Sequence, residues 1–176
     1  DFTAKHVILA SGAWSSFLGK ILHLNLPIQP AKGYSITVKR SSMHPTIPLN
    51  LMESKVAVTP MGNTLRFAGT LELAGLDFSI NQRRVEAILS AVPQYLPSLD
   101  PKNLELIEVW RGFRPCTPDG LPFLGNSPNY KNLVVATGHG MIGISLSPIT
   151  GMLVSQLVTG ETPPIDLTLL SVDRFS

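Results

Sequence analysis

The sequence predicts an α/β protein in which a block of antiparallel strands interrupts an incomplete parallel-sheet domain. Two continuous apolar runs, residues 7–10 and 133–137, each end in a glycine turn. That pattern is typical of strands buried on both faces of a parallel sheet. The strand-length segments between them alternate apolar and polar residues instead, as half-buried antiparallel strands do. The order of the segments therefore indicates an α/β domain with an antiparallel insertion.

Composition narrows the function classes. The chain has 176 residues, of which 44% are hydrophobic and 15% charged, so we expect a globular protein with a substantial core. The net charge of +2 comes without a basic stripe, which argues against nucleic-acid binding. The single cysteine, Cys116, excludes an internal disulfide and a multi-cysteine zinc site, and no His/Glu pair has metal-ligand spacing. No run of about 18 apolar residues is present to span a membrane.

The N-terminal segment begins almost directly with a strand. Residues 7–10 (Val-Ile-Leu-Ala) form the first predicted buried strand, and Asp1 stands close before it, so we expect further sequence upstream. Residues 13–20 are expected to turn helically. Pro27 and Pro30 then predict a linker.

The central block is expected to be an antiparallel sheet with one wetter face, followed by a helix. Its strands are predicted at residues 34–38, 55–59 and 64–68, with a turn at residues 61–63 between the last two. Asn81 is the expected helix cap. The apolar residues that follow it at helical spacing are Val85, Ile88, Leu89 and Val92. The helix should end at Pro93 and Pro97.

The last third returns to the parallel-sheet pattern. A strand is predicted at residues 104–109, then a Pro/Gly-rich loop that runs to Asn129, then the buried strand at residues 133–137. A helix follows, with Pro148 in its first turn and Gly160 beyond its end.

Residues 138–143 (Gly-His-Gly-Met-Ile-Gly) carry the spacing of a dinucleotide loop between a strand and a helix. Two interpretations are open. The glycines could serve only the backbone conformation of a tight turn, or their N–H groups could face an electron-rich ligand at the helix start. No acidic residue follows about 20 positions later to bind a ribose.

Arg114 stands in an apolar setting and is a candidate anion-binding residue. Its planar fork suits a ligand carboxylate, although Asp119 in the same loop could be its structural partner. His139 is either a ligand neighbour or a hydrogen-bonded turn histidine. Tyr34 either lines a pocket or sits in the sheet. Lys32 is expected to be solvated, and Cys116 to be inert.

Several motifs, in order and over nearly the whole chain, resemble the D-amino acid oxidase-like family of FAD-dependent oxidoreductases. Residues 110–122 (WRGFRPCTPDGLP) resemble the family signature W-x-G-x-R-P-x-T-P-D-G-x-P. Thr137-Gly138-His139-Gly140 with Gly143 resembles the closing motif, and residues 10–14 (ASGAW) an earlier turn. Residues 30–35 and 171–175 look like the D-amino acid dehydrogenase branch.

The resemblance implies a fold, domain boundaries and site residues. The fold would be a partial Rossmann-like FAD domain, residues 1–30 and 112–176, with an inserted antiparallel substrate-binding sheet and helix at residues 31–111. Arg114 would bind the substrate carboxylate, beside pocket residues Tyr34, Met52 and Ala57. The residues implied in cofactor binding, at the turn near the pyrophosphate and the loop facing the flavin pyrimidine ring, are Ser11, Gly12, Ala13, Trp14, Gly138, His139, Gly140, Met141, Ile142 and Gly143.

The chain departs from the family pattern in three ways. It has no G-x-G-x-x-G fingerprint in an N-terminal strand-turn-helix, so this chain alone is expected to lack FAD. Met141 stands where the glycine oxidase branch has a second arginine. Met52 and Ala57 replace that branch's pocket tyrosines. The last two changes argue for a roomier, more apolar pocket than glycine requires.

The expected function is that of the C-terminal part of an FAD-dependent dehydrogenase or oxidase. It would deaminate a D-amino acid by hydride transfer to flavin, with oxygen or a quinone as electron acceptor. Two alternatives stay open: an enzyme acting on a secondary amine such as a hydroxyproline isomer or sarcosine, and a catalytically inert carboxylate-binding partner subunit. We expect this chain alone to be inactive and self-associating, and the enzyme to be cytoplasmic or peripheral at the inner membrane of a bacterium.

Overall fold

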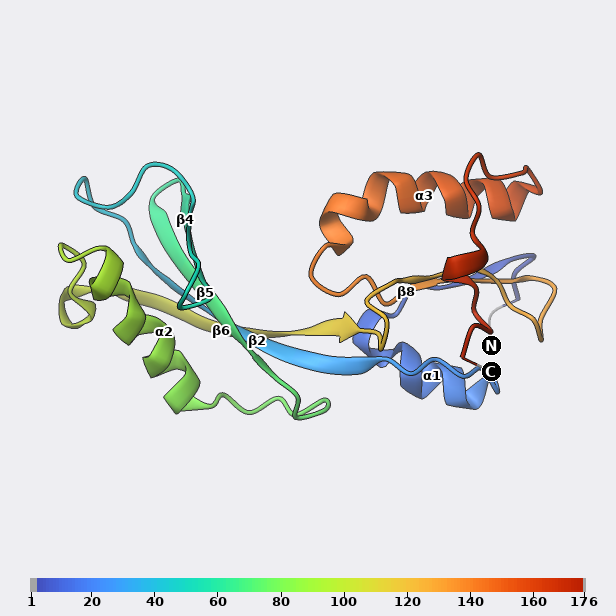
Figure 1. The fold of residues 1–176 in the computed structure, drawn as a ribbon, viewed down its shortest axis with the longest axis horizontal. Coiled ribbons are helices and arrows are strands. Elements are labelled where there is room, and N and C mark those ends of the chain that lie inside the picture. The colour runs from blue at the N-terminus through green and yellow to red at the C-terminus, as the bar shows by residue number, and fades with distance from the viewer. Residues whose placement is uncertain (1–2, 176) are drawn as a thin grey trace. The chain divides into compact units, whose positions relative to one another are not determined.

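The computed structural model describes residues 3–175 and divides into two compact units, which are coloured along the chain in Figure 1. The first unit comprises the chain up to Ala31 and from Arg114 onward, and the second comprises Lys32–Phe113. These boundaries lie one or two residues from those that the resemblance implies. The assignment of the units to cofactor and substrate stays a prediction.

The first unit is built on a three-stranded sheet with helices on its faces. Its strands are β1 (Val7–Leu9), β8 (Leu133–Thr137) and β7 (Phe123–Asn126), in the order β1-β8-β7. β1 runs parallel to β8, whereas β7 runs antiparallel to it. The helical elements are η1 (Gly12–Trp14), α1 (Ser15–Ile21), α3 (Gly143–Thr159) and η3 (Thr168–Leu170).

The side chains of β8 pack into two hydrophobic cores, because successive side chains of a strand point to opposite faces of the sheet. Leu133 and Val135 pack with Leu9 and, on the helix side, Leu18 of α1. Ala136 packs with Leu153 of α3 and its neighbours. All five residues of β8 are buried, as expected for a central strand with both faces covered.

Three predictions for the first unit need correction. Val7 and Ile8 are each 48% exposed, so only Leu9 of β1 is buried, because among the described residues β1 has a strand neighbour on one side only. β7 lies in the segment predicted as loop, where it pairs antiparallel with β8, the next strand along the chain. α3 begins at Gly143, so Pro148 lies beyond its first turn; Gly160 does cap the helix, in a left-handed conformation.

The second unit is a five-stranded sheet in the order β3-β4-β5-β2-β6. β3 (Leu49–Leu51), β4 (Val56–Met61), β5 (Thr64–Glu72) and β2 (Gln29–Lys39) are successively antiparallel, and β6 spans Leu106–Cys116. Helix α2 (Gln82–Tyr95) packs on β4 and β5, with η2 (Pro101–Asn103) near its end. The fold is therefore the predicted α/β arrangement with an antiparallel insertion.

Several local expectations differ in the second unit. β4 and β5 alternate as predicted, but β2 is buried on both faces from Pro30 to Val38. Pro30 lies inside that strand and not in a linker. Pro93 lies inside α2, two residues before the helix ends at Tyr95. Asn81 takes the cap position without a capping side-chain bond.

Candidate functional site

Two turns at the carboxyl ends of β1 and β8 form the candidate site. The strands are parallel, with Leu9 beside Val135, so both chains leave the sheet at the same edge. Gly12 follows β1 with a φ of +55°, and Gly138 and Gly140 follow β8 with φ of +81° and +53°. The carboxyl edge of parallel strands is where open α/β sheets bind ligands.

A chain of hydroxyl groups joins the two turns. Ser11 Oγ lies 3.0 Å from Ser15 Oγ, which lies 2.7 Å from Thr137 Oγ1. Thr137 Oγ1 in turn donates to the Gly12 carbonyl oxygen at 3.3 Å. Ser15 and Thr137 are buried, so these bonds form away from water and hold the Gly12 turn against the end of β8. This chain of hydroxyl groups was not predicted from the sequence, although the spacing of four residues between Ser11 and Ser15 was a signal for it.

The glycines of the site fall into two kinds. A Cβ on Gly138 would lie 2.7 Å from Thr117 Cγ2, so Gly138 is required for packing. A Cβ on Gly12 or Gly140 would meet nothing within 4 Å, although both have left-handed φ. Their bare backbone therefore borders open space, which fits the close approach of a flat or phosphorylated ligand. The backbone interpretation of this loop therefore applies at Gly138, and the ligand-facing interpretation stays a prediction for Gly140.

The segment that carries Arg114 is bonded to the glycine loop. The Gly140 N–H donates to the Pro115 carbonyl oxygen at 3.0 Å, and Thr117 packs under Gly138. Arg114, which is half-buried, immediately precedes Pro115 on β6. The structure thus brings three predicted parts of the site together in the first unit: the Gly12 turn, the glycine loop and the backbone next to Arg114.

Asp119, the alternative partner for Arg114, is bound by Arg174. Nε of Arg174 lies 2.8 Å from Oδ2 of Asp119, and Nη2 lies 3.2 Å from Oδ1. The Arg174 guanidinium also stacks on Phe123, 3.8 Å from the ring centroid. The Arg174 hydrogen bonds, with a backbone bond from Leu121, lower the pKa of Asp119 to about 2. This ion pair was not predicted from the sequence, because its two residues are 55 positions apart.

The remaining loop residues differ in exposure. His139 Nε2 lies 3.1 Å from Thr150 Oγ1, which ties the loop to α3, and burial lowers the pKa of His139. Met141 is 76% exposed, and Ile142 is exposed before the start of α3. The positive end of the α3 dipole lies at Gly143, next to this loop.

The predicted pocket residues of the second unit lie in different surroundings. Tyr34 is buried, and its hydroxyl donates to Glu72 Oε2 at 2.6 Å and accepts from the Asn81 N–H at 3.2 Å. Ala57 is half-buried on β4, and Met52 is exposed in the turn after β3. Their role in substrate binding stays a prediction.

Lys32 is not solvated, contrary to the prediction. Its side chain has no exposed surface, and its Nζ donates to Asp77 Oδ2 at 2.7 Å and to the Ser79 carbonyl oxygen at 3.0 Å. Exposure could not be read from the local sequence, because both partners arrive from the connection between β5 and α2.

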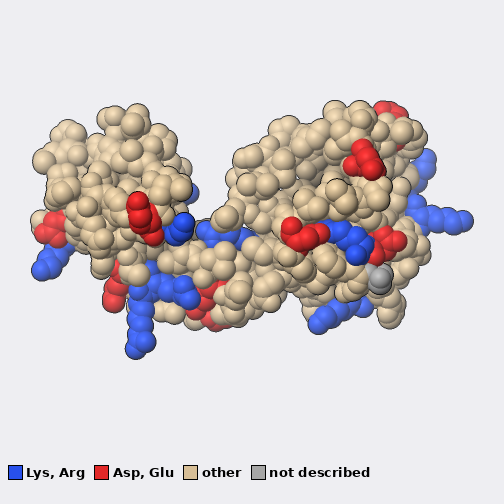
Figure 2. Space-filling view, in the orientation of Figure 1, with Lys and Arg blue, Asp and Glu red and all other residues tan. Residues whose placement is uncertain are grey.

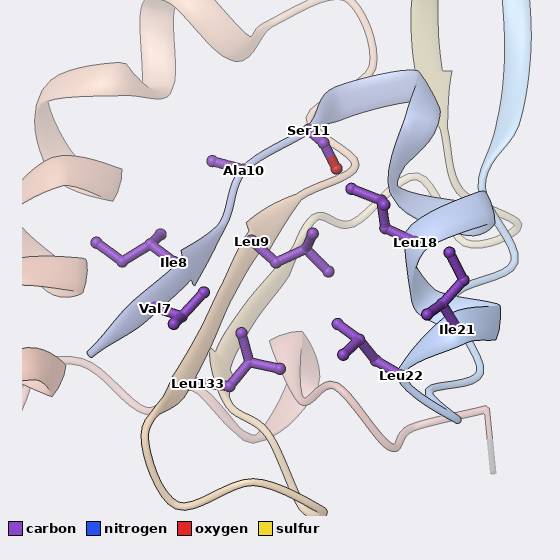
Figure 3. Close-up of a pocket in the computed structure, with 9 residues that line it drawn as sticks. All are labelled: Val7, Ile8, Leu9, Ala10, Ser11, Leu18, Ile21, Leu22 and Leu133. Atoms are coloured by element: carbon purple, nitrogen blue, oxygen red, sulfur yellow. The ribbon is translucent and has the colours of Figure 1, made fainter. Parts of the chain in front are cut away.

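An apolar groove of about 560 Å³ lies between β1 and α1. Figure 3 shows side chains of α1 facing Leu9 and Leu133 across it, with Ser11 as the polar member of its lining. The lining residues are Val7, Ile8, Leu9, Ala10, Ser11, Leu18, Ile21, Leu22 and Leu133.

Among the described residues, neither the charged side chains nor the potential metal-ligating side chains mark a further binding site. On the face shown in Figure 2, basic and acidic residues are interspersed. Within residues 3–175, no group of three or more His, Cys, Asp or Glu side chains could hold a metal ion. None of the helices described is long and apolar enough to cross a bilayer.

Comparison with known proteins identifies the family. Residues 1–157 match the model of the DAO family, described as FAD-dependent oxidoreductases. The chain belongs to this family. DAO-family relatives include D-amino acid dehydrogenases from Granulibacter bethesdensis, 35% identical over the whole chain and 42% of the relative, and from Paramagnetospirillum magneticum, 39% identical over 98% of the chain and 41% of the relative. The chain thus spans less than half the length of these relatives.

Solved DAO-family structures resemble the fold closely. Glycine oxidase from Geobacillus kaustophilus superposes with a TM-score of 0.89 at 34% identity, over 98% of this chain and 46% of that one. Iminodiacetate oxidase from Chelativorans sp. BNC1 superposes with a TM-score of 0.87 at 26% identity, over 97% of this chain and 47% of that one. The predicted resemblance to the DAO family is therefore confirmed.

Proposed function

We propose that this chain is the C-terminal part of an FAD-dependent oxidoreductase that oxidatively deaminates a D-amino acid. One observation carries the proposal: two open left-handed glycine turns, at Gly12 and Gly140, are joined at the carboxyl edge of parallel strands. Family membership and relatives named D-amino acid dehydrogenase support it.

The residues of the site fit FAD, which when bound would accept the substrate's hydride. The Gly12 turn would face the pyrophosphate side of the cofactor, and Gly140 its flavin side. The start of α3 would stabilise negative charge near the flavin, because a helix N-terminus carries a partial positive charge. The contacts of FAD would come from the residues of both turns, Ser11 to Trp14 and Gly138 to Gly143, apart from the N–H groups of Gly140 and Ile142, which are bonded to the carbonyl oxygens of Pro115 and His139.

Arg114 would bind the substrate carboxylate. Its segment is hydrogen-bonded to the glycine loop, through the Gly140 N–H and the Pro115 carbonyl oxygen. A bidentate contact would fix the substrate's orientation relative to the flavin. In the second unit, Met52 and Ala57 would leave room for an apolar side chain, and Tyr34 is buried in the core of the sheet.

A secondary amine is the second candidate substrate. The observation that favours it is the structural likeness to a protein named iminodiacetate oxidase, although at only 26% identity. We place D-amino acids first because the relatives with 35–39% identity bear that name.

The test uses the full-length polypeptide that contains these residues. It should purify with bound flavin and reduce a dye acceptor with several D-amino acids, but not with their L-enantiomers. Sarcosine and hydroxyproline isomers form the second arm, and oxygen and quinone acceptors are compared with the best substrate. A full-length protein that binds no flavin would support the inert carboxylate-binding alternative and overturn the proposal.

A further inference from the structure

In the chain of hydroxyl groups formed by Thr137, Ser15 and Ser11, the number of protons determines which group donates in each hydrogen bond. Each serine or threonine hydroxyl has one proton to donate and can accept on its oxygen. The Gly12 carbonyl oxygen can only accept, and it already receives the Ser15 N–H. The contact between Thr137 Oγ1 and that oxygen therefore uses the single proton of Thr137.

This first hydrogen bond determines the donors of the next two hydrogen bonds in the chain. Having donated to Gly12, Thr137 can only accept in its 2.7 Å contact with Ser15. Ser15, which has no exposed surface, therefore donates its only hydroxyl proton to Thr137 and must accept a hydrogen bond from Ser11 at 3.0 Å. The proton of Ser11, the partly exposed end of the chain, consequently points inward.

We infer that Ser11 presents only lone pairs to a ligand, and accepts a hydrogen bond from a sugar or sugar-alcohol hydroxyl of the cofactor. A phosphate oxygen has no proton to donate at neutral pH, so it would not pair with Ser11. This inference rests on the proposed function, since it concerns which part of FAD the Gly12 turn binds. It assigns the hydroxyl of Ser11 to the ribityl or ribose part of the cofactor and leaves the phosphates to other groups.

Binding to the full-length protein tests which ligand group meets Ser11. FAD and a set of FAD analogues, each with one ribityl or ribose hydroxyl replaced by hydrogen, are titrated into apoprotein by calorimetry. Ser11→Ala should weaken FAD binding about 2- to 10-fold, the range of one neutral hydrogen bond. With one deoxy analogue, the variant and the unsubstituted protein should bind equally. Ser16→Ala, which removes a half-buried hydroxyl of the next turn, is the matched control and should bind FAD normally.

Two outcomes would overturn the inference: unchanged FAD affinity in Ser11→Ala, or an equal loss with every deoxy analogue. Neutron diffraction of the deuterated full-length protein tests the direction without bound cofactor. The deuteron of Ser11 should lie between its oxygen and that of Ser15, and a deuteron that points away would refute the inference. Failure of the protein to bind FAD at all would instead count against the proposed function, and the neutron result would still decide the direction.

Discussion

Nζ of Lys32 lies 2.7 Å from Oδ2 of Asp77, and the lysine side chain has no exposed surface. Glu72 approaches the same nitrogen at 3.6 Å. Burial by itself lowers the pKa of Lys32, but hydrogen bonds with Asp77 and Tyr34 and the nearby negative charge of Glu72 outweigh it and raise the pKa above its usual range. The buried charge thus holds the connection between β5 and α2 onto β2.

Lys32→Met should destabilise the protein by about 1–3 kcal/mol, because Asp77 and the Ser79 carbonyl oxygen lose a charged donor. The matched control is Lys39→Met, which breaks a salt bridge to Glu105 whose side chains are 62% and 67% exposed. That change should stay within about 0.5 kcal/mol, as exposed pairs do. Urea denaturation of both variants measures the difference, and equal effects would contradict a structural role for Lys32.

The pair of Asp119 and Arg174 should contribute stability that depends on pH. The folded-state pKa of Asp119 is about 2, below the ordinary value of 3.8. Since the pKa is lowered by folding, the contribution is present above pH 4 and is lost as the pH falls through about 2. The stability difference between the unsubstituted protein and Asp119→Asn should therefore shrink between pH 5 and pH 2 in denaturation curves. A difference that stays constant over this range would exclude the pair as its source.

Gly138→Ala should destabilise the protein by at least about 1–2 kcal/mol, the cost of a left-handed alanine, with a further clash against Thr117. Gly151→Ala is the control, since Gly151 lies inside α3 with nothing within 4 Å of a Cβ. That substitution should stabilise the helix by about 0.5–1 kcal/mol. Thermal unfolding of the two variants should shift in opposite directions; a shift in the same direction would argue against the packing role of Gly138.

Arg114→Lys should impair turnover of the full-length enzyme mainly by raising the Michaelis constant. Lysine keeps the charge but loses the fork, which removes one charge-assisted hydrogen bond worth about 1.5–3 kcal/mol. The flavin content should not change, since the proposed cofactor contacts lie in the glycine turns and not at Arg114. Steady-state kinetics on a carboxylate substrate decide the point, and unchanged kinetics would rule out Arg114 as the carboxylate clamp.

This 176-residue chain on its own should purify colourless and self-associate through the apolar groove. Val7 and Ile8 on β1 expose an unpaired strand edge and apolar surface, which favours association. Ile8→Lys places a charge at that edge and should lower the apparent mass in sedimentation experiments, whereas Met43→Lys, on an exposed turn of the other unit, should not. Flavin retained at near-stoichiometric occupancy after desalting would contradict the first expectation.

The sequence by itself determined the elements whose signals are local. The apolar run at residues 133–137 is a buried strand, the turn around Gly62 joins two antiparallel strands, and Asn81 begins a helix. The motif that surrounds Arg114 and the glycines after β8 also identified the family, because those residue types stand at fixed spacings.

Only the tertiary structure decided which distant groups meet. Ser15 and Thr137 are 122 positions apart, and Lys32 and Asp77 are 45 apart, so no local pattern connects them. β7 was not predicted for a different reason: its four residues show no alternation of buried and exposed side chains, and its strand conformation depends on pairing with the next strand, β8. Periodicity records which side of an element faces the core, whereas the partner that a buried polar group finds is set by how the chain folds back on itself.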